Sequence, residues 1–344
     1  MKTDLKSLSY EELEKYLKVN FDVPKYKAKQ IFKWLYKGIE SFDEMTDISK
    51  ELRVQLNEKT YINVLQIQRK LISKIDGTTK YLFKLKDREY VESVVMKYKH
   101  GNSICISTQV GCKMKCDFCA SAINGFKRNL TASEIIDQII FAQKDLGERI
   151  SNIVLMGIGE PLDNFDNVLT FLKNVNHPDG LNISHRHISL STCGLTDKID
   201  RLADLDMQIT LSISLHAPND EIRKKIMPVS FKYPYNELIE CCKKYFEKTK
   251  RRISFEYILI DDLNDSKECA KMLSDKLCNF PCHVNLIPAN SVKEKSHKKS
   301  SREKVLEFQN ELLKNNINAT VRRTLGSDIN ASCGQLRNNE NPVK

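Results

Sequence analysis

Long apolar runs are missing from this sequence. No stretch approaches the about 18 consecutive apolar residues that a membrane-spanning helix needs. The opening segment, MKTDLKSLSYEELEKYLKVN, is polar and lacks the apolar part of a secretion signal. We therefore expect a cytoplasmic protein that does not associate with a membrane.

A disulfide framework is missing as well. The eleven cysteines are odd in number and unevenly spaced, unlike those of a small secreted protein held by disulfides. In a reducing compartment, clustered cysteines indicate metal binding or catalysis. We expect several cysteines to pack as small apolar side chains instead: Cys193, Cys241, Cys242, Cys269, Cys278 and Cys282.

Acidic residues are in the minority. The chain has 55 Lys and Arg against 45 Asp and Glu, a formal net charge of +10. A nucleic acid partner would explain this excess, and lysines on a solvated surface would explain it equally well. With 344 residues, 41% of them hydrophobic and 29% charged, the composition predicts a globular protein with one large and one small domain.

Residues 1–65 are predicted to form a small helical domain. Ser9 and Glu12 have the spacing of a capping box at the start of one helix. The run KYKAKQIFKWLYKGI has an apolar face, and SFDEMTDISKELRVQL is predicted to form a third helix. Residues 66–100 are β-branched or alternating around an Asp-Gly turn at 76–77, which predicts a small connecting antiparallel sheet.

Residues 101–335 alternate predicted strands with predicted helices, which favours a parallel sheet. The predicted strands are ICIST (104–108), NIVLMG (152–157), HISLST (187–192), QITLSISLH (208–216), ISFEYILI (253–260), HVNLIP (283–288) and ATVRRTL (319–325). About six repeats are fewer than the eight of a closed barrel. The predicted fold class is therefore α/β, a partial TIM-like (βα)6 barrel, with residues 336–344 as a C-terminal tail.

Three cysteines lie close together in CKMKCDFC, directly after the first barrel strand: Cys112, Cys116 and Cys119. A closed structural zinc site needs four protein ligands. Three thiolates can instead hold three irons of a [4Fe–4S] cluster and leave the fourth iron open for a substrate. The alternative is a zinc site whose fourth ligand is distant in the sequence, for example Cys105 or a histidine.

The C-x3-C-x2-C spacing with Phe118 before the last cysteine resembles the radical S-adenosylmethionine (SAM) superfamily. Further segments resemble the RlmN/Cfr family of RNA adenosine methyltransferases: ICISTQVGC, GFKRNL, MGIGEPLDN, LSTCG, SLHAPNDEIR, NLIPAN and DINASCGQL. The N-terminal YKAKQIFKWLYKGIESFDEMTD is similar to the RNA-handling helical domain of that family. The resemblance covers nearly the whole chain in the same order.

The resemblance implies that the three clustered cysteines bind one [4Fe–4S] cluster and that SAM chelates its open iron. It also implies a set of SAM contacts at predicted strand ends: Gly159, Glu160, Ser191, Ser214, Leu215, His216 and Asn290. Two of these assignments have plainer alternatives. Gly159 and Glu160 would also suit a strand-to-helix turn before Pro161, and a lone histidine such as His216 is more often an interior residue.

The resemblance also implies a reaction that uses two SAM molecules per turnover. One methylates Cys333, and the second gives a radical that activates the methyl group for addition to adenosine. Cys105 then releases the product by forming a disulfide with Cys333. Glu92 in YVESVV matches the base that removes a proton from the adduct, although the strand pattern alone favours an exposed Glu92.

The Glu-Pro pair in MGIGEPLDN is more similar to the RlmN branch than to the Cfr branch. The RlmN branch implies methylation of adenosine C2 in 23S rRNA, at the peptidyl transferase centre of a naked or protein-poor precursor. It also implies methylation of the adenosine 3′ to the tRNA anticodon, and an electron donor such as flavodoxin or ferredoxin. Basic candidates for RNA contact are Lys127, Arg128, Arg322 and Arg323.

Three other readings stay open on the sequence. A Cfr-like enzyme would methylate C8 instead and confer antibiotic resistance. A radical SAM enzyme acting on a peptide or small molecule would not need both Cys105 and Cys333. A non-catalytic zinc-bearing RNA-binding protein would contain zinc and be colourless, whereas an iron–sulfur protein is brown.

The lysine- and serine-rich segment 291–301 is predicted to be a loop. Its lysines could contact RNA phosphates or could simply be solvated, and the sequence favours neither role.

Overall fold

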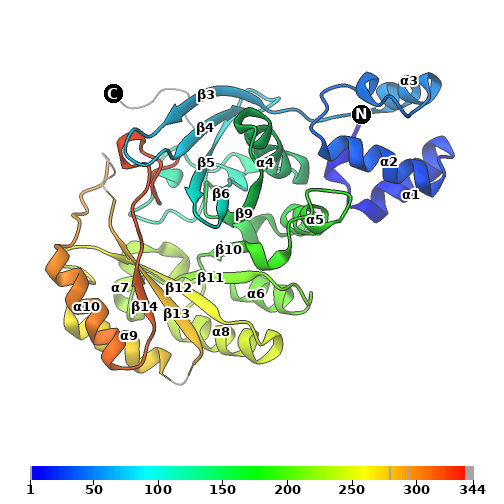
Figure 1. Cartoon of the computed structure of the whole chain (residues 1–344). Coiled ribbons are helices and arrows are strands. Elements are labelled where there is room, and N and C mark those ends of the chain that lie inside the picture. The colour runs from blue at the N-terminus through cyan, green and yellow to red at the C-terminus, as the bar shows by residue number, and fades with distance from the viewer. Residues whose placement is uncertain (1, 279, 291, 293, 338–344) are drawn as a thin grey trace.

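One large sheet organises the molecule, as the computed structural model in Figure 1 shows. The structure describes residues 2–278, 280–290, 292 and 294–337; residues 338–344 of the predicted tail lie outside the described residues. The order of the ten strands is β14-β13-β12-β11-β10-β9-β6-β5-β4-β3. Their bounds are β3 (Gln66–Ile72), β4 (Thr79–Lys84), β5 (Tyr90–Tyr98), β6 (Gly101–Cys105), β9 (Ile150–Leu155), β10 (Ile188–Thr192), β11 (Thr210–Ser214), β12 (Ile253–Leu259), β13 (Cys282–Pro288) and β14 (Ala319–Val321).

The strands β6 and β9–β14 run parallel, each to its neighbour in the sheet. Because β14 and β3 are the two ends of the strand order, the barrel is open. The prediction of a partial parallel barrel is confirmed, including a last strand after the sixth helix–strand repeat. The carboxyl ends of these strands meet at one side of the sheet, where ligands of parallel α/β proteins bind.

The antiparallel strands β3–β5 continue this sheet directly, because β5 pairs with β6. The predicted connecting strands are therefore part of the barrel sheet and not a sheet of their own. In this register Val94 lies opposite Cys105. Side chains alternate along a strand, so Glu92 shares a face with Val94 and hence with Cys105.

Helices follow most of the parallel strands, as predicted. Their bounds are α4 (Ala132–Leu146), α5 (Phe165–Asn176), α6 (Thr196–Ala203), α7 (Asp220–Ile226), α8 (Tyr235–Thr249), α9 (Lys267–Leu277) and α10 (Arg302–Lys314). The first of them, α4, begins with a complete capping box between Thr131 and Glu134 and is buried along most of its length. Among the described residues, no helix combines the length and apolar character that crossing a membrane requires.

The N-terminal helices are α1 (Tyr10–Phe21), α2 (Lys25–Tyr36) and α3 (Lys50–Lys59), and they project to one side of the barrel (Figure 1). The predicted capping box of Ser9 and Glu12 is present at α1. The predicted third helix is divided, because Ser41 caps a short 3-10 turn and Ser49 caps α3 separately. Two short two-stranded sheets lie outside the large sheet. They pair β1 (Thr3–Asp4) with β2 (Thr60–Tyr61), and β7 (Gln109–Val110) with β8 (Arg128–Asn129).

A buried ion pair connects the N-terminal segment to the barrel. Lys6 pairs with Asp137 of α4, and both side chains are completely buried. The Lys6 ammonium also donates to the Asn63 carbonyl at 2.9 Å, and the Asn63 amide donates to Asp137 at 2.9 Å. Removing one partner of such a pair leaves an uncompensated buried charge.

Replacing Lys6 with methionine is therefore expected to lower the free energy of unfolding by about 3–5 kcal/mol in urea denaturation. Lys144 forms a matched control, since its ion pair with Glu40 also joins the two parts but is half exposed. Replacing Lys144 with methionine should cost less than about 1 kcal/mol. Equal losses in the two variants would contradict a special role for the buried pair.

Candidate active site

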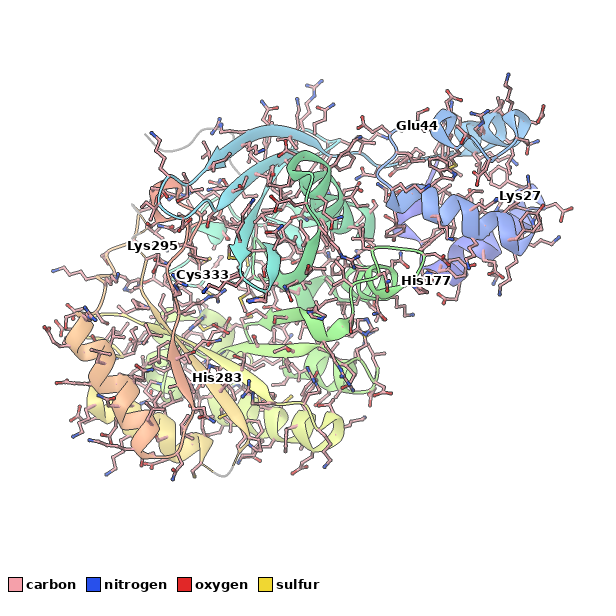
Figure 2. All side chains as sticks on the ribbon, viewed as in Figure 1. Lys27, Glu44, His177, His283, Lys295 and Cys333 are labelled. Atoms are coloured by element: carbon pink, nitrogen blue, oxygen red, sulfur yellow. The ribbon has the colours of Figure 1, made fainter. Side chains whose placement is uncertain are left out.

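A pocket opens at the carboxyl ends of the parallel strands. Most of the predicted site residues line it: Cys112, Cys116, Cys119, Gly159, Glu160, Ser191, Ser214, His216 and Cys333. These residues come from segments that are far apart in the sequence. Figure 2 shows Cys333 near the centre of the molecule, between the antiparallel strands and the second half of the barrel.

The three clustered cysteines lie in the loop between β7 and a 3-10 turn at Ala120–Ala122. Neighbouring segments hold this loop: the Asp117 N–H donates to the Ile226 carbonyl at 2.8 Å, and the Ala120 N–H donates to the Gly334 carbonyl at 2.8 Å. Burial raises the pKa of Cys112 to about 12 and that of Cys116 well above its ordinary value. A bound metal would favour the thiolate forms of these cysteines.

The three cysteines fit an iron–sulfur cluster better than a zinc ion. In the described part of the chain, no three Cys, His, Asp or Glu side chains converge closely enough to hold one metal ion. A [4Fe–4S] cluster is larger than an ion and attaches each thiolate to a different iron. Three thiols that share one pocket without converging on one point suit that larger group, and they leave one iron for a further ligand.

Two glycines bring the segment after β9 against the segment that follows β6. Gly159 has φ +104°, and a Cβ atom there would lie 2.6 Å from the Cβ of Gln109. A Cβ at Gly157 would lie 2.5 Å from the Ile106 carbonyl oxygen. Neither position tolerates a side chain without a shift of its neighbours. The plainer prediction for Gly159 and Glu160, a strand-to-helix turn before Pro161, is also confirmed, because a 3-10 turn (Pro161–Asn164) follows them.

The Glu160 carboxylate is buried at the bottom of this turn. It accepts the Cys193 N–H at 2.7 Å and the Leu162 N–H at 3.0 Å. Burial raises the pKa of Glu160, and these two hydrogen bonds oppose the rise. The carboxylate therefore has a fixed orientation while it lines the pocket, which suits the ammonium group of a ligand.

The ends of β10 and β11 place Ser191 and Ser214 side by side, with their hydroxyl oxygens 3.3 Å apart. His216 follows with φ +58°. Its Nδ1 accepts the Ile258 N–H at 3.0 Å, so the ring carries its proton on Nε2. Burial lowers the pKa of His216 to about 3, so the ring is neutral. His216 is thus an interior histidine that also lines the pocket.

Two predicted SAM contacts are placed differently from the rest. Leu215 is fully buried and does not line the pocket; its carbonyl accepts a hydrogen bond from Arg223 at 3.1 Å. The side-chain amide of Asn290 donates to the Cys333 carbonyl at 3.0 Å. Asn290 therefore holds the segment that carries Cys333 in this structure.

Cys105 and Cys333 come together at the mouth of the barrel. The nearby Cys333 adds to burial in raising the pKa of Cys105 to about 12, and the Arg322 guanidinium opposes this rise. Cys105 packs in a small apolar cluster that includes Val94 and Leu336. Both thiols are free. The Arg322 guanidinium thus offsets part of the effect of burial on Cys105.

Glu92 is buried, so the expectation of an exposed strand residue is wrong. Its carboxylate pairs with Lys80 at 2.8 Å and accepts the Arg337 N–H at 2.7 Å. The Lys80 ammonium also donates to the Asn330 carbonyl at 2.9 Å. The Lys80–Glu92 ion pair thereby binds the chain on both sides of Cys333, at Asn330 and at Arg337. No sequence pattern indicates this role for Lys80, whose partners are distant in the chain.

The basic candidates for RNA contact differ in their surroundings. Lys127 pairs with Glu89 at 2.6 Å, and Arg128 pairs with Glu134 at 2.8 Å. Arg322 lines the pocket. Arg322 therefore shares a pocket with Cys333.

The loop 291–301 is folded onto the site. Residues 291 and 293 lie outside the described residues, but Lys295 and His297 contact Asp117 of the cysteine loop at 3.2 and 2.7 Å. Glu294 forms a two-pronged pair with Arg337 at 2.6 and 2.7 Å. These pairs tie the loop to the cluster segment and to the segment that follows Cys333.

Comparison with known proteins agrees with this geometry. Residues 106–273 match the radical SAM superfamily, and residues 3–62 match the ribosomal RNA large subunit methyltransferase N-terminal domain. The chain is 57% identical to a probable dual-specificity RNA methyltransferase RlmN of Alkaliphilus oremlandii, over 98% of each chain. It is 52% identical to the protein of that name from Clostridium novyi, over 97% of each chain.

A solved structure is also similar. The crystal structure of a radical SAM methyltransferase from Sphaerobacter thermophilus superimposes with a TM-score of 0.93. The two sequences are 39% identical, and the match covers 98% of this chain and 100% of that one. The similarity therefore extends over both the N-terminal helices and the barrel.

Proposed function

The chain belongs to the RlmN family of radical SAM RNA methyltransferases, and from this premise we propose that it methylates C2 of adenosine in 23S rRNA and in tRNA. The observation that carries the proposal is the shared pocket. Cys333 lines the same cavity as the three clustered cysteines and Glu160. A methyl-carrying thiol and a radical source have to share one site for this reaction.

We propose that Cys112, Cys116 and Cys119 hold one [4Fe–4S] cluster and that SAM binds beside it, with Glu160 next to its ammonium group. Ser191, Ser214 and His216 line the same cavity and are proposed to contact the remainder of SAM. When bound, the cluster reduces SAM and so supplies the radical that the reaction needs. A reduced flavodoxin or ferredoxin is the proposed electron donor.

Two cysteines of the chain are proposed to react in turn: Cys333 carries the methyl group and Cys105 releases the product. The Cys333 thiolate attacks the methyl group of a first SAM and becomes a thioether, and S-adenosylhomocysteine leaves. A second SAM is consumed when that methyl group is activated and joined to the adenine. The Cys105 thiolate then attacks the Cys333 sulfur: the S–S bond forms as the bond from that sulfur to the transferred carbon breaks. The electron pair of the broken bond takes up a proton and completes the methyl group of the RNA that leaves. Arg322 lines the same pocket as Cys333, and its charge opposes the burial that raises the pKa of Cys105.

Glu92 is the proposed acceptor of the proton that leaves the adenine. Burial raises the pKa of Glu92, which increases its affinity for that proton. Its pairing with Lys80 gives it a second task, because the same carboxylate holds the Cys333 segment.

We further propose that residues 1–65 bind the RNA and present its adenosine to the barrel formed by residues 101–335.

Mass spectrometry of nucleosides tests this proposal. The protein is expressed in cells that lack their own enzyme of this family, and rRNA and tRNA are digested separately. We expect 2-methyladenosine in both RNA classes, and no 2-methyladenosine with the empty vector. Appearance of 8-methyladenosine instead would identify a Cfr-like enzyme, and the absence of both from cells containing cluster-loaded protein would overturn the RNA methyltransferase proposal.

Replacing Glu160 with glutamine is expected to weaken SAM binding about tenfold to a hundredfold, because a charge-assisted hydrogen bond is lost. The new amide would also turn an N–H group toward one of the two backbone donors. Equilibrium dialysis of labelled SAM with the reconstituted protein measures the effect. The control is Asp166→Asn on α5, whose carboxylate lies on the surface; similar affinity of both variants would contradict the assignment of Glu160.

A further inference from the structure

One buried arginine near the cysteine loop has no carboxylate partner among the residues that the structure describes. Arg223 on α7 is completely buried. Its guanidinium donates to the Leu215 carbonyl at 3.1 Å, to the Cys193 carbonyl at 2.6 Å and to the Ser230 hydroxyl at 2.8 Å. A weaker contact reaches the Ser214 carbonyl at 3.3 Å. All four acceptors are neutral.

No described Asp or Glu forms an ion pair with Arg223. Asp220 lies one turn away on the same helix, but it pairs with Lys224 at 3.1 Å and accepts the Tyr235 N–H at 3.0 Å. The hydrogen bonds satisfy the donors of the guanidinium without neutralising its charge. A buried charge without a counter-ion is costly, so an anion is expected nearby.

The groups that favour the charged form of Arg223 point to that anion. Burial lowers the pKa of Arg223, and the thiols of Cys193 and Cys116 are the strongest opposing influences. A hydrogen bond also attaches the end of α7 to the cysteine loop. The Ile226 carbonyl at the end of α7 accepts the N–H of Asp117, the residue after Cys116, at 2.8 Å. The helix that carries Arg223 is therefore attached to the cluster loop.

We propose that Arg223 is the buried counter-ion of the iron–sulfur cluster held by Cys112, Cys116 and Cys119. Three thiolates and the sulfides of a cluster are anionic, so they supply the charge that the protein does not provide. The inference rests on the proposed cluster site. It assigns to Arg223 two tasks: to fix the ends of β10 and β11, and to stabilise the reduced cluster, which carries one more negative charge.

Redox titration of three variants tests the inference. Arg223→Gln removes the charge and keeps hydrogen-bond donors, whereas Arg223→Lys keeps the charge with fewer donors. Arg251→Gln is the control, because Arg251 donates to the Ile209 carbonyl at the opposite end of the same strands. The cluster's midpoint potential, followed by electron paramagnetic resonance, is expected to become more negative in Arg223→Gln. Arg223→Lys and Arg251→Gln should stay close to the unsubstituted protein.

Thermal stability gives a second readout that does not depend on turnover. Removing the cluster should lower the Tm of the unsubstituted protein more than that of Arg223→Gln, because only the former then keeps an unpaired buried cation. Unchanged potential and an equal Tm loss in all variants would overturn the inference and leave Arg223 a purely structural role. A protein whose three cysteines bind no iron would overturn the proposed function as well, so the two failures are distinguishable.

Discussion

Replacing Cys333 with alanine is expected to lower RNA methylation by at least about a thousandfold, because the reaction loses the atom that carries the methyl group. Cluster content and SAM binding should persist. Cys333 is only partly buried, and its carbonyl, which accepts the Asn290 amide, is retained in the variant. The measurement is single-turnover methylation of a tRNA transcript, with iron content determined on the same sample.

The control for this variant is Cys278→Ala. Cys278 is exposed just after α9, and we expect its replacement to leave activity unchanged. An active Cys333→Ala protein would contradict the methyl-carrier mechanism. It would show that this chain methylates RNA without a methyl group carried on Cys333.

Replacing Cys105 with alanine is expected to trap a covalent complex between the protein and RNA. The variant can still methylate Cys333 and join it to adenine, but no thiolate remains to release the product. Multiple turnover should fall by about a thousandfold. Denaturing gel electrophoresis should show a slow protein band that ribonuclease shifts back, and mass spectrometry should find a nucleotide on the Cys333 peptide.

Cys282→Ala is the matched control, because Cys282 is also a strand cysteine of the same sheet but lies at the beginning of β13. It should show neither the slow band nor a loss of turnover. Normal turnover in Cys105→Ala would contradict the role of a Cys105–Cys333 disulfide. Loss of activity without the covalent complex would contradict the order of steps, since it would place Cys105 before the adduct.

Local patterns were sufficient to predict much of the fold. Alternating and β-branched runs marked the barrel strands, and Ser9 with Glu12 marked the start of α1. The cysteine spacing predicted one loop that could hold a cluster. The division of the third N-terminal helix was missed, because Ser41 and Ser49 each cap a separate element within an otherwise helical pattern.

Contacts between distant segments could not be predicted from such patterns. The strand pattern predicts an exposed Glu92, but Lys80 and the Arg337 N–H, which come from other parts of the chain, bind its carboxylate. The buried pairing of Lys6 with Asp137 spans more than a hundred residues and has no local pattern. For Arg223 the informative feature is that none of the described carboxylates pairs with it, which only the assembled site reveals.

The most direct test of the two-sulfur mechanism follows a labelled methyl group through the protein. The protein is first allowed to methylate itself with isotopically labelled SAM, freed of that SAM, and then given RNA, reductant and unlabelled SAM for one turnover. The mechanism predicts that the first 2-methyladenosine carries the label, because its carbon comes from Cys333. An unlabelled product, with the label still on the protein, would contradict the mechanism.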